Sequence, residues 1–245
     1  MIAITLRQAD HAQNQPSPPR PGRVPIGRLL AVIEEVIRSK PAFWAGHSPD
    51  LGAHVSTVTA ALFTWPLGDD AALIPRTVAI EDAYQALLEV NYERLAPWFS
   101  GAFEQPPTLE GTHADLARDS HAWLEGSQLP LAITVKAEHG WRLVGWVNLL
   151  IERPARMAEV GYWVHAGFEG RGLVTRAVTA VLDHAFGPLG LHRVKLQTIS
   201  NNKRSRSVAQ RLGFTQEGVL REAAAFPDER RDVVVYGLLA SDWAS

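Results

Sequence analysis

Residues 158–179 read AEVGYWVHAGFEGRGLVTRAVT, and this stretch decides the fold. Its first part, 159–165, is an apolar run that predicts a β-strand. Residues 173–186 predict a helix that begins directly after a glycine-rich turn. The apolar side chains of this helix recur on one stripe: Val174, Ala177, Val178, Val181, Leu182 and Ala185. A strand, a glycine turn and an amphipathic helix in succession indicate helices that pack against a sheet.

The turn itself predicts a binding site for an anion. Gly170 and Gly172 have no Cβ, so the backbone can approach a ligand closely there. The first helical N–H groups, from about Arg171 to Thr175, have no partner within the helix and point out of its end. Together these groups suit a pyrophosphate. By itself, the fragment also fits a purely structural turn.

Two common phosphate-binding motifs do not fit this turn. The dinucleotide fingerprint G-x-G-x-x-G requires a third glycine where the chain has Thr175, and the P-loop requires Gly-Lys-Ser/Thr. The acyltransferase signature R/Q-x-x-G-x-G/A does fit, at Glu169-Gly170-Arg171-Gly172-Leu173-Val174. Glu169 stands in place of Arg or Gln, and Val174 in place of the small residue. A loop that binds through backbone N–H groups tolerates both changes, although the charge of Glu169 is mildly unfavourable beside a phosphate.

On these residues the chain resembles the GNAT acyltransferases, in the branch of Rim-type ribosomal-protein N-terminal acetyltransferases. The likeness spans about residues 60–245. Further motifs support it in the same order along the chain: AEVGYW at 158–163, NKRS at 202–205, RLGF at 211–214, EGVLR at 217–221 and LLASDW at 238–243. The resemblance implies an α/β (α+β) fold of the GNAT type, a mixed and mostly antiparallel sheet flanked by helices. It also implies acetyl-coenzyme A (acetyl-CoA) as the acetyl donor.

The same resemblance implies where the donor binds. Its pyrophosphate would lie on the amides of 170–175, and its pantetheine arm would lie as an added strand beside the strand that ends at Val164. Asn202 would cap the next helix and touch the pantetheine. Three basic residues suit the remaining phosphate of the coenzyme or simply form a solvated helix start: Lys203, Arg204 and Arg206. The nine histidines show no metal-ligand spacing, so no metal is expected.

Acyl transfer to an amine needs a group that donates a proton to the leaving thiolate. Many GNAT enzymes carry a tyrosine four residues before the glycine of the Gly-Phe motif, and here that position is Ala209. The Rim-type branch suggests Ser205 instead. Ser205 lies at helical spacing from Val208, Ala209 and Leu212, so it is the polar member of an inward stripe. Its hydroxyl would contact the thiol or bond locally in the first helical turn.

The general base is harder to place. The Rim-type pattern has a glutamate where this chain has Ala224. Glu222 is two residues away on the same expected strand and therefore on the same face, roughly 6–7 Å along it. Glu159 lies near the position of the base in other GNAT branches. Either carboxylate could act through a water or be an ordinary edge residue.

The remaining chain predicts one mixed α/β domain at 59–245. Strands are expected at 60–65, 72–80, 129–137, 142–151, 194–199, 219–225 and 233–239, and helices at 82–98, 112–124 and 203–212. Thr112 is expected to cap the helix at 112–124, with Asp115 as its capping partner. Seven of the 16 prolines fall in residues 1–50, so residues 1–58 are expected to be a flexible extension.

The amino-acid composition excludes several classes of function. The 245 residues are 46% hydrophobic and 20% charged, a mixture that can bury a sizeable core. A net charge of −2 argues against a nucleic-acid partner, and the lack of cysteine excludes thiolate metal sites and cysteine nucleophiles. No run of 18 apolar residues and no signal peptide is visible, so a cytoplasmic protein without a membrane partner is expected.

The function expected from these residues is acetylation of a protein N-terminal α-amine, with a ribosomal protein as partner. An α-amine has a pKa of about 7.7–8.0 against about 10.4 for lysine, so a weak base suffices for it near neutral pH. Two alternatives stay open: acetylation of a small amine such as a polyamine or an antibiotic, and a non-catalytic sensor that binds acyl-CoA. The oligomeric state, a homodimer included, is not readable from the sequence.

Overall fold

The computed structural model describes residues 2–3, 64–98, 106–138 and 140–243. Its strands are β1 (Ile2–Ala3), β2 (Trp65–Pro66), β3 (Ala71–Pro75), β4 (Gln128–Ala137), β5 (Gly140–Glu152), β6 (Met157–Val164), β7 (Arg193–Ile199), β8 (Thr215–Ala225) and β9 (Arg230–Leu239). Its helices are α3 (Glu81–Leu95), α4 (Leu109–Glu125), α5 (Leu173–Phe186), α6 (Lys203–Arg211) and the short α7 (Ala240–Trp243). Three 3₁₀ turns, at Val78–Ile80, Ala96–Trp98 and Ala166–Phe168, connect them.

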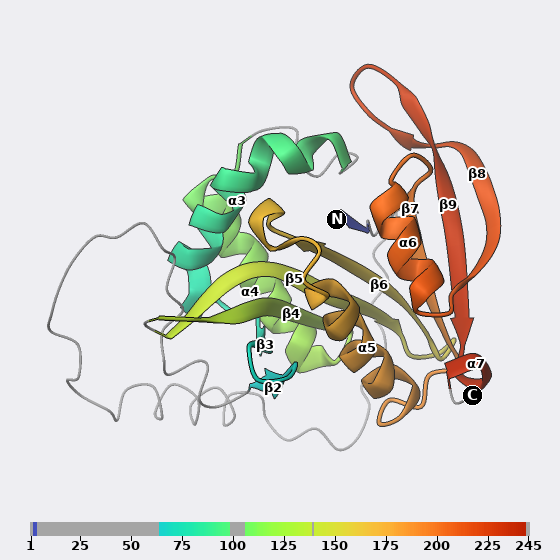
Figure 1. The fold of residues 1–245 in the computed structure, drawn as a ribbon, viewed down its shortest axis with the longest axis horizontal. Helices are drawn as coiled ribbons and strands as arrows, with labels where there is room; N and C mark the ends of the chain where they lie inside the picture. Colours follow the sequence, from blue (N-terminus) through green and yellow to red (C-terminus); the bar gives the residue numbers. More distant parts are fainter. Residues whose placement is uncertain (1, 4–63, 99–105, 139, 244–245) are drawn as a thin grey trace, which may run out of the picture. The chain divides into compact units, whose positions relative to one another are not determined.

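The strands form one sheet in the order β2-β3-β4-β5-β6-β7-β9-β8, and β1 pairs with β6 (Figure 1). All neighbours are antiparallel except β6 and β7, which are parallel. The parallel pair needs a crossover connection, and α5 supplies it. The expected fold class, a mixed and mostly antiparallel sheet with flanking helices, is confirmed.

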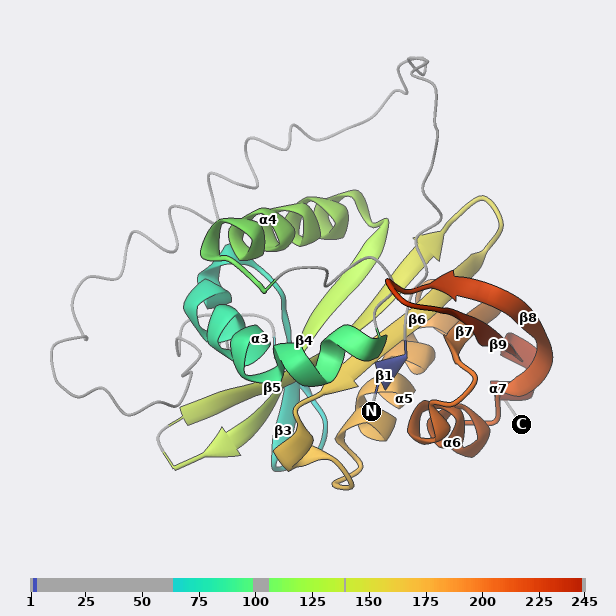
Figure 2. The same cartoon turned by 90° about the horizontal axis from the view of Figure 1, so that it is seen from above.

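Helices cover both faces of the sheet (Figure 2). On one face, α5 and α6 pack against the strand residues Val160, Tyr162 and Val164. On the other face, α3 and α4 pack over a second cluster that includes Trp163. Side chains alternate between the two faces along a strand, so neighbouring residues of β6 belong to different cores.

The sheet divides between its two parallel strands. β6 and β7 pair at Met157 with Arg193, at Ala158 with Val194 and at Glu159 with Lys195. Beyond this point β6 follows β5 as far as Val164, whereas β7 follows β9 as far as Ile199. The backbone edge of β6 from Val160 to Val164 is therefore not paired with β7.

Several local expectations need correction. The helix expected from Thr112 begins at Leu109, and its N-cap is Thr108, whose side chain accepts a hydrogen bond from the Gly111 N–H. Thr112 instead lies within the helix and donates its hydroxyl to Gln85. The strand expected at 72–80 ends at Pro75. The expected strand at 60–65 and the extension at 1–58 lie outside the described residues, apart from β1 and residues 64–65.

Candidate functional site

The glycine turn before α5 adopts the geometry of an anion-binding helix start. Gly170 and Gly172 have φ of +76° and +72°, a region that favours glycine. Gly172 is the N-cap of α5, and the Arg176 N–H donates the first helical bond to its carbonyl at 3.0 Å. The N–H groups of 173–175 precede that bond, so they have no carbonyl partner within the helix. A Cβ placed on either glycine would meet no described atom within 4 Å, so the turn is open on its outer side.

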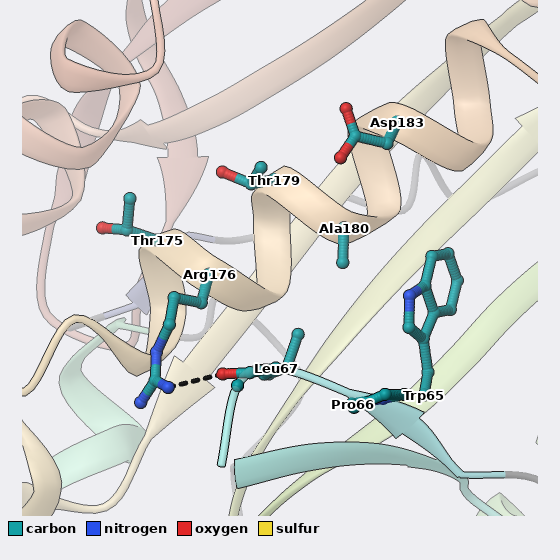
Figure 3. A pocket seen from close by; sticks show the side chains of 9 residues that line it. Trp65, Pro66, Leu67, Thr175, Arg176, Thr179, Ala180 and Asp183 are labelled. Atoms are coloured by element: carbon teal, nitrogen blue, oxygen red, sulfur yellow. Dashed lines mark hydrogen bonds between the residues drawn. The ribbon is translucent and has the colours of Figure 1, made fainter. Parts of the chain in front are cut away.

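Two hollows lie near this turn, and Thr175 lines both of them. The larger one, about 480 Å³, lies between α5 and the β2 segment, and Trp65, Arg176 and Asp183 line it (Figure 3). Its charged groups are already paired within the protein: Arg176 with Asp70 and the Leu67 carbonyl, and Asp183 with the Trp243 indole.

The smaller hollow, about 60 Å³, is formed by the turn itself. It is lined by Val164, Phe168, Glu169, Gly170, Gly172, Leu173, Val174, Thr175 and Arg211. The backbone N–H groups of the helix start point out of this end of α5, and their direction favours the binding of a negatively charged group. The residues expected to hold the pyrophosphate therefore come together in one place. Arg171 lies in the same turn, with its guanidinium 4.7 Å from the Phe168 ring centre.

Glu169, the residue that departs from the acyltransferase signature, lies between two arginines. One carboxylate oxygen is 3.1 Å from Arg94 and the other is 2.6 Å from Arg204. Arg94 comes from α3 and also donates to the Val164 carbonyl at 2.7 Å. The unfavourable charge expected at this position is thus balanced by two cations, and α3 is tied to the end of β6.

Ser205 is fully buried in the first turn of α6. Its hydroxyl lies 3.0 Å from the hydroxyl of Tyr162, which reaches it from β6. Burial raises the pKa of the Tyr162 hydroxyl, although its hydrogen bond with Ser205 acts in the opposite direction. Both groups are therefore neutral near pH 7 and can relay a proton between them.

The residue that sequence reasoning missed is Tyr162. The signature position for a tyrosine is Ala209, so the sequence suggested that no phenol is present. The phenol comes from β6 instead, 43 residues before Ser205. Strand alternation gave a usable signal, because Val160, Tyr162 and Val164 share the face that α5 and α6 cover.

Asn202 caps α6 as expected. Its side-chain oxygen accepts a hydrogen bond from the Ser205 N–H at 3.1 Å. Because an N-cap bond satisfies one of the free amides of the first turn, it also fixes the backbone that carries the Ser205 hydroxyl. Behind the cap, Arg206 donates to the Tyr236 hydroxyl and the Ser200 carbonyl, at 3.1 Å each.

Glu159 lies where the sheet divides, at the last residue of β6 that pairs with β7. It is 9% exposed, and one of its oxygens is 2.8 Å from the Lys195 ammonium. Its place in the alternation puts it on the face of Trp163, opposite to the face of Tyr162 and Ser205. Glu159 and the Tyr162–Ser205 pair therefore approach the division of the sheet from opposite sides.

Two further polar groups share the face of Glu159. Among the described residues, the indole nitrogen of Trp163 and the side-chain oxygen of Asn148 are buried without a hydrogen-bond partner. Asn148 lies opposite Gly161 on the neighbouring strand β5. A buried donor and a buried acceptor without partners favour a polar ligand on this face.

Glu222 does not share a face with Ala224, contrary to the expectation. A register shift between Leu220 and Ala224 interrupts the pairing of β8 with β9. Glu222 has a φ of +50° in this bulge and is exposed, whereas Ala224 is fully buried in the core under α3. A bulge adds residues to one strand, so the two-residue alternation no longer holds across it.

None of the described helices is long and apolar enough to cross a membrane.

Comparison with known proteins decides the family. The model of the acetyltransferase (GNAT) domain matches residues 73–215, more than half of the chain. The chain belongs to the GNAT acetyltransferase family. It is therefore an acetyl-CoA-dependent N-acetyltransferase, and the matched region contains the glycine turn, Tyr162 and Ser205.

Two relatives show where the acetyltransferase stands within the family. YdaF of Bacillus subtilis (strain 168), whose name provisionally describes a ribosomal N-acetyltransferase, is 31% identical over 162 residues, 64% of this chain and 84% of the relative. The ribosomal protein uS5-alanine N-acetyltransferase of Escherichia coli (strain K12) is 31% identical over 175 residues, 70% of this chain and 89% of the relative. The chain thus resembles RimJ/RimL-like enzymes.

Solved structures agree on the fold. The crystal structure of a probable acetyltransferase superposes with a TM-score of 0.67 at 27% identity, covering 74% of this chain and 99% of that one. The microcin C7 self-immunity acetyltransferase MccE, solved with acetyl-CoA and AMP, has a TM-score of 0.64 at 24% identity and covers 71% and 94%. Relatives of this acetyltransferase therefore bind acetyl-CoA.

Proposed function

We propose that this acetyltransferase moves the acetyl group of acetyl-CoA to the α-amine at the N-terminus of a protein, a ribosomal protein in particular. The observation that carries the proposal is the route from the glycine turn to the Tyr162–Ser205 pair. The turn suits the diphosphate of the coenzyme, and the edge of β6 that is not paired with β7 leads from it to the division of the sheet. The identity of the acceptor draws support from the name of the uS5-alanine enzyme.

The donor site divides into a phosphate part and a pantetheine part. Gly170, Arg171, Gly172, Leu173, Val174 and Thr175 would hold the diphosphate through their backbone. The pantetheine arm contains two amide groups, which suit the N–H and C=O groups on the edge of β6 that does not pair with β7, in the manner of an added strand that ends at Val164. Asn202 lies at the start of α6, where its amide would meet the far end of the arm.

The chemistry requires two proton transfers, one from the amine nitrogen and one to the sulfur, and the residues proposed for them lie on opposite faces of the sheet. Acetyl-CoA supplies a thioester carbonyl, which the neutral amine attacks to form the new C–N bond. Ser205, hydrogen-bonded to Tyr162, would donate a proton to the sulfur as the C–S bond breaks. Glu159 would accept the proton that the amine nitrogen loses, directly or through a water.

Of the two proposed bases, Glu159 has the better position. It is buried where the sheet divides, whereas Glu222 lies in an exposed bulge. Glu222 would reach the acceptor from the β8–β9 hairpin only through a water. The substitutions Glu159→Gln and Glu222→Gln separate the two, because only the loss of the residue that accepts the proton from the amine nitrogen lowers kcat.

An acceptor panel tests the proposal. The full chain and labelled acetyl-CoA are incubated with peptides that carry ribosomal-protein N-termini, with the same peptides blocked at the α-amine, and with polyamines and aminoglycosides. We expect transfer to free N-terminal peptides, and little transfer to blocked peptides that retain a lysine. Transfer to small amines alone would replace the proposal by small-molecule acetylation. Tight coenzyme binding without any transfer would replace it by a sensor.

A further inference from the structure

Where the edge of β6 no longer pairs with β7, it pairs with another strand of the same chain. The two residues of β1, Ile2 and Ala3, pair antiparallel with Trp163 and Tyr162. β1 also contacts β7 and α6, so it lies in the division of the sheet (Figure 2). This is the stretch of β6 that lies beyond its last pairing with β7.

Strand geometry identifies which backbone groups this short strand uses. The His165 N–H donates to the Val144 carbonyl of the β5 segment at 2.7 Å. Backbone groups alternate in direction along an antiparallel strand, so the N–H and C=O groups of Tyr162 and Val164 point away from β5. The Val164 carbonyl accepts from Arg94. The backbone of Tyr162 therefore faces Ala3, its partner in the register.

The position of this pairing matters for the donor. It involves Tyr162, whose hydroxyl meets Ser205, and it lies two residues before Val164, which lines the hollow at the glycine turn. An extended peptide and a pantetheine arm offer the same kind of groups, amides at a spacing that a strand edge can bind. Both cannot bind the backbone of Tyr162 at once.

We infer that β1 is a displaceable plug: a strand of the chain's own N-terminal segment that occupies the pantetheine track and competes with acyl-CoA for the edge of β6. This inference rests on the proposed donor site. A competitor within the same chain lowers the apparent affinity for the coenzyme by the fraction of molecules in which the track is occupied. Anything that removes this strand from the edge would raise that affinity.

A pair of substitutions at one position tests whether the strand occupies the edge. Ala3→Pro removes the backbone N–H that faces Tyr162, and proline is incompatible with strand pairing there. Ala3→Val keeps the N–H and suits a strand, so it is the matched control. Hydrogen exchange at the Tyr162 amide, measured by NMR without coenzyme, reports the pairing. We expect faster exchange in Ala3→Pro than in the wild type and in Ala3→Val. Equal exchange rates at the Tyr162 amide in all three proteins would overturn the inference that β1 occupies the edge of β6.

Calorimetry with coenzyme A on the same three proteins tests the competition. Ala3→Pro removes one or two backbone hydrogen bonds, so we expect its affinity to be roughly 3- to 10-fold tighter than that of the wild type. Ala3→Val should bind as the wild type does. Equal affinity in all three, with faster exchange in Ala3→Pro, would overturn the competition and leave the proposed function standing. If none of the proteins binds coenzyme A, the proposed donor site itself is wrong.

Discussion

At the scale of single residues, the chemistry depends on groups that come from distant parts of the chain. The Tyr162 and Ser205 hydroxyls meet at 3.0 Å although one lies on a strand and the other on a helix. Glu169 is held by arginines of α3 and α6. Each of these residues can be changed alone, so its role can be separated from that of its neighbours.

The open side of the glycine turn gives the first prediction. A glutamate at Gly172 would place a side chain and a negative charge where the diphosphate is expected, so Gly172→Glu should abolish coenzyme A binding in calorimetry. The control is Gly190→Glu. Gly190 also has a positive φ, of +58°, and no described atom within 4 Å of an added Cβ, but it follows the other end of α5. Loss of binding in both variants would show that backbone strain, and not the turn, is responsible.

The hydroxyl pair of Tyr162 and Ser205 gives the second prediction. Ser205→Ala removes the proposed proton donor and should lower kcat about 10- to 1000-fold while KM for acetyl-CoA changes little. Tyr162→Phe keeps the packing and the Ser205 hydroxyl, so a smaller loss is expected if Tyr162 only relays the proton. Steady-state kinetics on the preferred peptide measures both. A Ser205→Ala enzyme as fast as the wild type would exclude Ser205 as the acid.

At the scale of elements, the local sequence predicts most strands and helices. The remaining features depend on pairing between strands that are distant in the sequence. The helix expected at 173–186 has the bounds of α5, because a glycine precedes it and one apolar stripe continues to its end. The sequence predicts Thr112 as the N-cap of α4, four residues after the actual cap, Thr108. Both threonines suit an N-cap by residue type, and only the structure shows that Thr108 accepts the hydrogen bond from the Gly111 N–H. The bulge at Glu222 and the pairing of β1 depend on partner strands, which no local pattern identifies.

The corrected cap leads to a prediction on stability. Thr108→Ala removes the acceptor of the Gly111 N–H and should lower the free energy of unfolding by about 1 kcal/mol. Urea unfolding followed by circular dichroism measures the change. Ser207→Ala is the control: its hydroxyl donates to the Lys203 carbonyl within α6, so its removal leaves no helix N–H without a partner. An equal effect of the two substitutions would contradict the assignment of Thr108 as the cap.

At the scale of the whole molecule, two histidines couple stability to pH. Burial lowers the pKa of His184, which packs edge-on against Trp65. Burial, together with the positive charges of Arg142 and Arg94, also lowers the pKa of His165. The unfolded chain then binds more protons than the folded one as the pH falls below about 6.5, so stability rises with pH through this range.

The corresponding prediction is that the free energy of unfolding decreases between pH 7.5 and pH 5.5. His184→Gln should make this decrease smaller, because it removes a group whose pKa burial lowers. Urea unfolding of the variant and the wild type at the two pH values provides the comparison. A decrease that is the same in both proteins would assign the pH dependence to other groups.

The division of the sheet at Glu159 has a consequence for how specificity can diverge. The proposed contacts with the cosubstrate come from β6, the glycine turn, α5 and the start of α6, whereas α3 and α4 cover the opposite face of the sheet. Exchange of α3 and α4 between relatives should therefore change which amine is acetylated while the binding of acetyl-CoA stays the same. Chimeric proteins that keep 157–212 and take α3 and α4 from a relative would test this separation.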